Sequence, residues 1–160
     1  MALTFLRNLG IVSSADISTT KLGTGAVLQV VSATVGQTDM ANTTGYVGSG
    51  ASITPSSTSN NILVIVDGYV EKTSGIAGNY AVTALHRATT FLTDVNNATQ
   101  YQYTVGARMP FSINYLDSPS STSSTQYRIY HDEQSGGATY RYYQYITTLM
   151  EIKAWLQKQY

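Results

Sequence analysis

The sequence predicts an all-β domain, a jelly-roll-like antiparallel β-sandwich that follows a short N-terminal arm. Three observations predict this fold. Segments rich in branched and aromatic residues recur along the chain from Ala26 onward. Runs of Ser, Thr, Gly and Pro separate them, as is typical of turns between strands. No stretch of ten or more residues has the apolar periodicity of an amphipathic helix. Short strands punctuated in this way indicate a sandwich or a jelly roll.

Roughly eight strands are expected from these segments. Residues 61–70 (NILVIVDGYV) are apolar on both faces in their first half, which suits a strand at the centre of a sandwich. In residues 79–92, alternation predicts that Tyr80, Val82, Ala84 and His86 face the core. The other expected strands are 26–35, 101–105, 111–116, 125–131, 138–143 and 145–154. The expected loops are 45–51, 54–61, 73–79, 117–124 and 134–137.

Composition excludes several classes of function. Nine Lys and Arg balance nine Asp and Glu, so no basic surface for phosphates is expected and nucleic acid is not a predicted partner. Cysteine is absent, which excludes disulfides, thiolate metal sites and a cysteine nucleophile. No apolar run approaches the ~20 residues of a membrane span, and we identify no secretory signal in the N-terminal residues. A neutral, hydroxyl-rich chain instead suits a surface that is packed in an assembly.

Residues 1–24 differ from the rest and are predicted to form an anchoring arm, while residues 25–160 form the sandwich domain. The arm carries a short apolar cluster, Phe5, Leu6, Leu9 and Ile11. This cluster is too short for a stable free helix, which needs about 12–15 residues. Two interpretations stay open: the segment packs on its own domain, or it docks on a partner.

No constellation of residues indicates catalysis, and no metal or cofactor is expected. His131 and Glu133 would share one face of a strand, but no third ligand accompanies them. His86 is expected to be half-buried or to form an interface contact. No serine lies in a G-x-S-x-G elbow, and the acidic residues are dispersed along the chain. We therefore expect a protein that is not an enzyme.

Thirteen tyrosines are the most informative residues, and they crowd the second half of the chain. Alternation predicts that Tyr101 and Tyr103 share a face, as do Tyr143 and Tyr145. A rigid ring with a polar tip suits a partly wet interface. The tyrosines can therefore form half-buried strand surface, a subunit interface or a glycan-binding surface. The single tryptophan, Trp155, lies outside the cluster, which favours a subunit interface over sugar stacking.

Four runs of sequence, in order along the chain, carry a resemblance to a known class. They are residues 25–34 (GAVLQVVSAT), 53–64 (ITPSSTSNNILV), 112–119 (SINYLDSP) and 146–152 (ITTLMEI). Together they resemble the β-sandwich domains of tail fibres and of head-surface fibres or decorations in tailed phages, including cyanophages. The resemblance covers residues 25–154. It implies a jelly-roll-like sandwich in a homotrimer, made in the host cytoplasm, without catalysis and located in the virion.

The short N-terminal arm distinguishes between the members of that class. A fibre carries a long shaft before such a module, whereas only residues 1–24 precede it here, so we expect a capsid decoration or cement protein. Three sandwiches would bury tyrosine and aliphatic surface around a three-fold axis, and each arm would bind neighbouring subunits of the major capsid protein. The alternative is a tail protein, a tail-fibre or tail-tip receptor-binding module. Its loops 45–51, 73–79 and 134–137 would then contact host surface glycans.

Overall fold

The computed structural model describes residues 22–76, 78–94, 105–134 and 136–154. These residues form ten strands and no helix, so they contain no helix that could span a membrane. The strands are β1 (Val27–Val35), β2 (Thr38–Ala41), β3 (Gly45–Ile53), β4 (Asn61–Ser74), β5 (Ala81–Arg87), β6 (Thr90–Asp94), β7 (Arg108–Asp117), β8 (Thr125–Glu133), β9 (Thr139–Tyr142) and β10 (Tyr145–Ile152).

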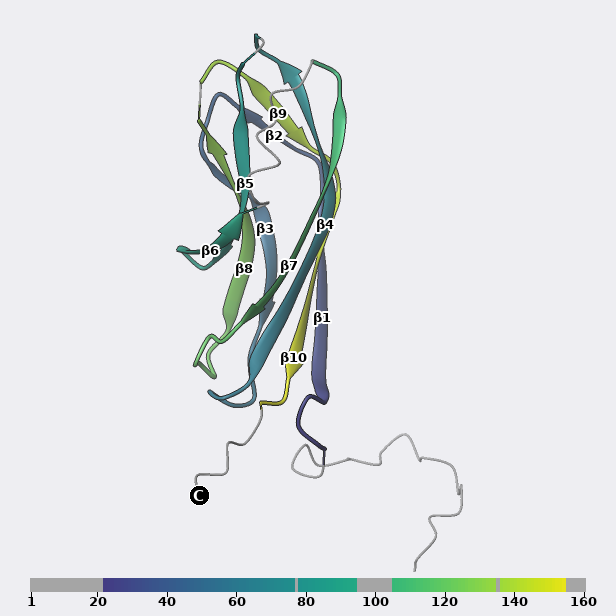
Figure 1. The fold of residues 1–160 in the computed structure, drawn as a ribbon, viewed down its shortest axis with the longest axis vertical. Coiled ribbons are helices and arrows are strands. Elements are labelled where there is room, and N and C mark those ends of the chain that lie inside the picture. The colour runs from purple at the N-terminus through teal and green to yellow at the C-terminus, as the bar shows by residue number, and fades with distance from the viewer. Residues whose placement is uncertain (1–21, 77, 95–104, 135, 155–160) are drawn as a thin grey trace, which may run out of the picture.

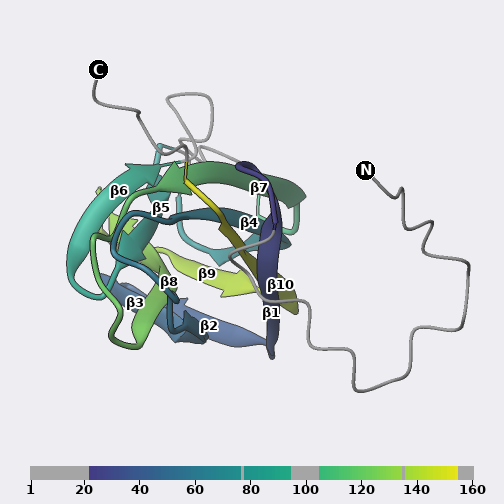
Figure 2. The same ribbon diagram turned by 90° about the horizontal axis from the view of Figure 1, so that it is seen from below.

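Two antiparallel sheets face each other, with β1, β10, β4 and β7 in the larger sheet and β3, β8, β5 and β6 in the smaller (Figures 1 and 2). Strands β9 and β2 extend the larger sheet, because β9 pairs with both the second half of β4 and β2. With these two short strands set aside, the order β1-β10-β4-β7 opposite β3-β8-β5-β6 is that of a jelly roll. The predicted fold class, a jelly-roll-like antiparallel β-sandwich, is confirmed.

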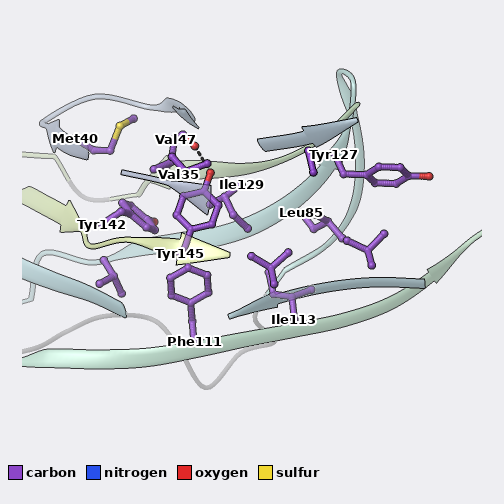
Figure 3. Packing of buried hydrophobic residues seen from close by; sticks show 14 of the residues in the cluster. Val35, Met40, Val47, Leu85, Phe111, Ile113, Tyr127, Ile129, Tyr142 and Tyr145 are labelled. Atoms are coloured by element: carbon purple, nitrogen blue, oxygen red, sulfur yellow. Dashed lines mark hydrogen bonds between the residues drawn. The ribbon is translucent and has the colours of Figure 1, made fainter. Parts of the chain in front are cut away.

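Alternation along each strand places one set of side chains between the sheets. Strand β4 buries Ile62, Val64 and Val66, and β8 buries Tyr127 and Ile129. Figure 3 shows the rings of Tyr145 and Phe111 meeting in this core. The Tyr145 hydroxyl donates a hydrogen bond to the backbone carbonyl of Val47 in the opposite sheet. Burial raises the pKa of Tyr145 far above its ordinary value, so the phenol stays a donor throughout the physiological range.

The expected loop at residues 45–51 is wrong, because these residues belong to β3. Val47 and Ala51 are buried in the core, and both pair with β8. The pairing shifts register between them, where Gly48 and Gly50 have φ angles of 70° and 64°. A Cβ on Gly48 would lie 2.3 Å from a methyl carbon of Val35. The glycines therefore mark a bulge inside a strand, where the backbones approach closely, and not a connection between strands.

The single strand expected at residues 79–92 is also wrong. The chain turns after β5 at Ala88, whose φ is 50°, and returns as β6. Ala81 and Leu85 belong to the core cluster and Ala84 does not, so the face predicted to be buried is the outer one, although Ala84 on that face is itself buried. Pairing with β8 sets this choice, since Thr83 lies opposite the buried His131 and Leu85 opposite the buried Ile129.

Substitution of Gly68 by alanine tests the packing between β4 and β10. A Cβ on Gly68 would lie 2.5 Å from the Cβ of Tyr145 and 2.9 Å from the Phe111 ring, both in the core. We expect Gly68→Ala to lower the free energy of unfolding by about 1–3 kcal/mol, because the core must shift to admit the methyl group. Urea unfolding measures this change. The matched control is Gly36→Ala, whose Cβ would meet nothing within 4 Å. Equal stability of the two variants would contradict the packing argument.

Candidate functional site

The outer face of the larger sheet carries a line of apolar side chains, which we call the apolar band. It consists of Val30, Met150, Leu63 and Leu116, which lie opposite one another in the pairings β1–β10, β10–β4 and β4–β7. Their neighbours along β4 and β10, such as Ile62 and Leu149, point into the core. Strands lie about 4.8 Å apart, so the band runs across the sheet for about 14 Å.

The band is unusual for a sheet that faces water, because such a face normally carries polar side chains. Val30 is 56% exposed and Leu116 is 58% exposed, whereas Leu63 and Met150 are half-buried. Ile65 adjoins the band in the next row, where Ser32 and Thr148 pair through their hydroxyls at 3.0 Å. A contiguous apolar patch with a polar rim is the composition of a protein interface. Such a patch is stabilised when it is buried against another apolar surface.

A buried carboxylate fixes the strands that carry one end of the band. The Glu151 side chain lies in the core and accepts hydrogen bonds from Asn60 at 2.6 Å, from the backbone and hydroxyl of Ser56 at 2.7 Å each, and from Gln29 at 2.7 Å. It therefore ties β1, β10 and the connection before β4 together. Burial alone would raise the pKa of the Glu151 carboxyl, but these hydrogen bonds outweigh it, and the pKa lies below its ordinary value.

A second feature of the same outer face is the exposed ring of Tyr69, which is 54% exposed. Tyr69 lines two open hollows. One, of about 330 Å³, is lined by Tyr69, Asp67, Gly68, Pro110, Phe111 and Ser112. The other, of about 350 Å³, is lined by Tyr69, Arg108, Tyr143 and Gln144.

The polar wall of the second hollow is held by a triad of side chains. Glu71 accepts a hydrogen bond from the Tyr143 hydroxyl at 2.5 Å and one from Arg108 Nε at 3.1 Å. The Arg108 guanidinium also lies over the Tyr143 ring, 4.0 Å from its centroid. The hydrogen bond from Tyr143, followed by that from Arg108, lowers the pKa of Glu71 below its ordinary value. The carboxylate therefore stays ionised and holds both partners at neutral pH.

The two histidines carry no catalytic arrangement. His131 is buried, with Nδ1 3.0 Å from the Tyr142 hydroxyl and Nε2 3.6 Å from Glu133. Burial lowers the pKa of His131 to about 4, so the ring is neutral at pH 7. His131 and Glu133 share a face as expected. Among the described residues, no group of three or more His, Asp and Glu side chains could hold a metal ion.

His86 is half-buried as expected, but it lies on the outer face of the smaller sheet and not on the core face that alternation predicted. Its ring stacks on Tyr130 with centroids 4.5 Å apart, and Phe91 meets its edge at 5.9 Å. Arg128 lies over the nearby Tyr46 ring, 3.5 Å from its centroid. Burial and then the Arg128 charge lower the pKa of His86. His86 and Tyr130 cover each other's faces, whereas Phe91 touches the cluster at an edge and stays 57% exposed.

The predicted interface residues are separated by the structure. Tyr143 lies on the surface beside Arg108, whereas Tyr145 lies inside the core and has no exposed ring to offer a second chain. They do not share a face, because β9 ends at Tyr142 and β10 begins at Tyr145, so a turn interrupts the alternation. The other named residues lie outside the described part of the chain: Phe5, Leu6, Leu9, Ile11, Tyr101 and Tyr103.

Two of the three predicted glycan-contacting loops meet at one end of the sandwich. The side chain of Asn79 donates a hydrogen bond to the backbone carbonyl of Gly136. The nearby Asn42 side chain accepts one from the backbone of Gly137 at 2.5 Å. The loops are therefore tied to each other, and the third predicted loop is the bulged part of β3.

This chain resembles known proteins in its fold alone. No family model matches the chain, and no curated protein matches it. The crystal structure of an infectious bursal disease virus VP2 subviral particle matches with a TM-score of 0.50 and 13% identity, over 76% of this chain and 32% of that chain. T=1 particles derived from infectious bursal virus match with a TM-score of 0.49 and 10% identity, over 76% and 31%. The chain thus spans about a third of the virus chains it matches. The likeness is one of fold.

Replacement of Glu151 by glutamine tests the buried carboxylate that supports the band. The folded-state pKa lies below the unfolded value of about 4.3, so its contribution is present above that pH and lost as the pH falls through the folded value. We expect Glu151→Gln to cost about 1–3 kcal/mol at pH 7. We also expect the variant to lose less stability than the original protein between pH 6 and pH 3.

Urea unfolding at a series of pH values measures both effects. The exposed Asp67, in the same sheet, supplies the control variant Asp67→Asn, which removes a carboxylate that is not buried. Parallel pH profiles for the original protein and Glu151→Gln would contradict the assignment.

Proposed function

We propose that this chain is a non-enzymatic virion structural protein, a homotrimeric decoration or cement protein on the head of a tailed phage. The observation that carries the proposal is the apolar band, since a contiguous apolar patch on a sheet face, with Val30 and Leu116 exposed at its two ends, marks a surface that a partner covers. The jelly-roll fold and the resemblance of residues 25–154 to phage virion domains support the same function.

The partner that covers the band is a second copy of the same chain. Formal charges sum to zero, so copies meet without net repulsion. Fully burying a Val, Leu or Met side chain contributes about 1.5–3 kcal/mol. The band is partly buried already, so each subunit gains a fraction of that sum. Contacts repeated in all three subunits of a trimer add up to a stable assembly.

The arm, residues 1–24, supplies the attachment to the capsid. The end of the arm is fixed to the sandwich, because the Lys153 ammonium donates to the carbonyl of Leu22 at 2.5 Å. The first sandwich residue, Gly25, donates to the carbonyl of Lys153 at 2.9 Å. Because the end of the arm is bonded to the residue that follows β10, a force on the apolar arm residues would be carried to that strand. These residues are Phe5, Leu6, Leu9 and Ile11. Three such arms on one trimer raise each other's effective concentration at the shell, so weak single contacts become strong together.

Lysine substitutions in the band test the assembly. We expect the original protein to sediment as a species of three chains of 17.3 kDa, and Val30→Lys and Leu116→Lys to sediment as single chains, because an interface core does not accept an unpaired charge. Sedimentation velocity measures the masses. Ile76→Lys is the control, since Ile76 is a 76% exposed apolar residue outside the band. A monomeric original protein, or trimeric band variants, would count against this interface.

Deletion of residues 1–20 tests the arm separately. We expect a folded trimer that no longer binds phage heads, because the sandwich and the band stay intact while the apolar cluster is lost. Co-sedimentation with heads that lack the protein measures binding, and circular dichroism confirms the fold. Binding at full occupancy without the arm would overturn the anchoring role.

Immunogold electron microscopy of intact virions tests where the protein is located. We expect the label to lie over the head. Label confined to the tail would contradict a decoration protein.

A further inference from the structure

We propose that the two hollows beside Tyr69 bind a neutral saccharide, with the exposed Tyr69 ring as the platform between two sugar units. The inference is independent of the assembly proposal, because it rests on a different part of the outer face. The hollows are about 330 and 350 Å³, at the small end of the range of about 300–1,000 Å³ for small-molecule sites. Both are lined by Tyr69, so a chain of sugars can occupy them together.

The chemistry of the lining matches the two kinds of surface that a sugar presents. A pyranose has a face of C–H groups, which packs on an aromatic or proline ring, and a rim of hydroxyls, which needs donors and acceptors. Tyr69 and Pro110 supply the apolar surface. Asp67 and Ser112 lie directly opposite each other on β4 and β7 in the first hollow and supply a carboxylate and a hydroxyl. Arg108 and Gln144 supply N–H donors in the second.

The polar groups are held before any ligand arrives. Arg108 is fixed by its bond to Glu71 at 3.1 Å and by its position 4.0 Å above the Tyr143 ring. Glu71 takes only one of the five guanidinium N–H donors through Nε. The backbone amide of Tyr143 donates to the carbonyl of Tyr69 at 2.9 Å, which holds the two aromatic residues side by side. A site organised in advance loses less entropy on binding.

Charge selects a neutral sugar over an acidic one. The Arg108 cation is already paired with Glu71, so it offers no uncompensated charge to a uronic acid or a sulfate. The exposed Asp67 carboxylate repels an anion in the adjacent hollow. The same carboxylate accepts hydrogen bonds from neutral hydroxyls, and such charge-assisted bonds are the stronger kind.

An NMR titration of the full chain with defined oligosaccharides tests the proposal. The probes are maltohexaose, cellohexaose, mannohexaose and xylohexaose, with tri-galacturonic acid as the acidic comparison. We expect at least one neutral probe to shift the amide signals around Tyr69, Arg108, Ser112 and Gln144, with a dissociation constant of about a millimolar. Tyr69→Ala should weaken that binding about tenfold or more, whereas Tyr69→Trp should retain it.

The matched control is Phe91→Ala, which removes a ring of similar exposure, 57%, from the opposite sheet. It should bind the probe like the original protein. Several results would overturn the proposal: no localised shifts with any neutral probe, tighter binding of the acidic probe, or equal binding by Tyr69→Ala. Sedimentation of the same samples separates this proposal from the assembly. If Tyr69→Ala loses the oligomer, the hollows belong to a protein interface and the saccharide site is wrong.

Discussion

The hydrogen bond from Tyr145 to the carbonyl of Val47 joins the two sheets through the middle of the core. Tyr145 is the first residue of β10, and Val47 is the last paired residue before the β3 bulge. The bond therefore fixes the start of one strand against the irregular point of another. A buried hydroxyl that lacks a partner costs free energy, so β3 and β10 cannot slide past each other without a penalty.

Gly68 extends that constraint to the outer face. The absence of a Cβ lets Tyr145 and Phe111 pack closely against β4, and this sets the positions of β10 and β7 on either side of that strand. The rows of the outer face follow from these positions. Toward the N-terminal end of β4 the row through Leu63 is apolar across four strands, and toward its C-terminal end the row through Tyr69 is aromatic and hydrogen-bonded. One central contact thus positions both candidate surfaces.

Most strands could be predicted from the sequence because their branched runs are strong, as in β1, β4, β8 and β10. Strand β3 could not, since Gly48 and Gly50 are used for a bulge and glycine predicts a loop when the partner strand is unknown. The face of β5 was ambiguous because both alternating sets are of similar polarity, and only pairing with β8 distinguishes them.

The candidate site was harder to predict than the fold. The apolar band joins four residues that are far apart in sequence, so it exists only once three strand registers are known. Alternation within β4 gives two faces but does not identify the outer one, because Ile62–Val66 are apolar throughout. The sequence singles out Tyr143 as an interface candidate, but it does not show that Arg108 and Glu71, which come from other strands, contact it. Apart from its residue type, nothing in the sequence indicates that Tyr69 belongs to a binding surface.

The two candidate surfaces can operate on one face without competing. Leu63 and Tyr69 are six residues apart on β4, which corresponds to about 20 Å along a strand. An ordinary interface covers about 800 Å² on each partner, a patch of about 16 Å radius when it is circular. A partner centred on the apolar band therefore stops short of the Tyr69 ring. Asp67 and Ser112 lie opposite each other in the row between them, so on β4 and β7 the edge of the assembly would fall at polar groups that tolerate water. On β10 the same row carries Ile146, which is 49% exposed, so the apolar surface extends further along that strand.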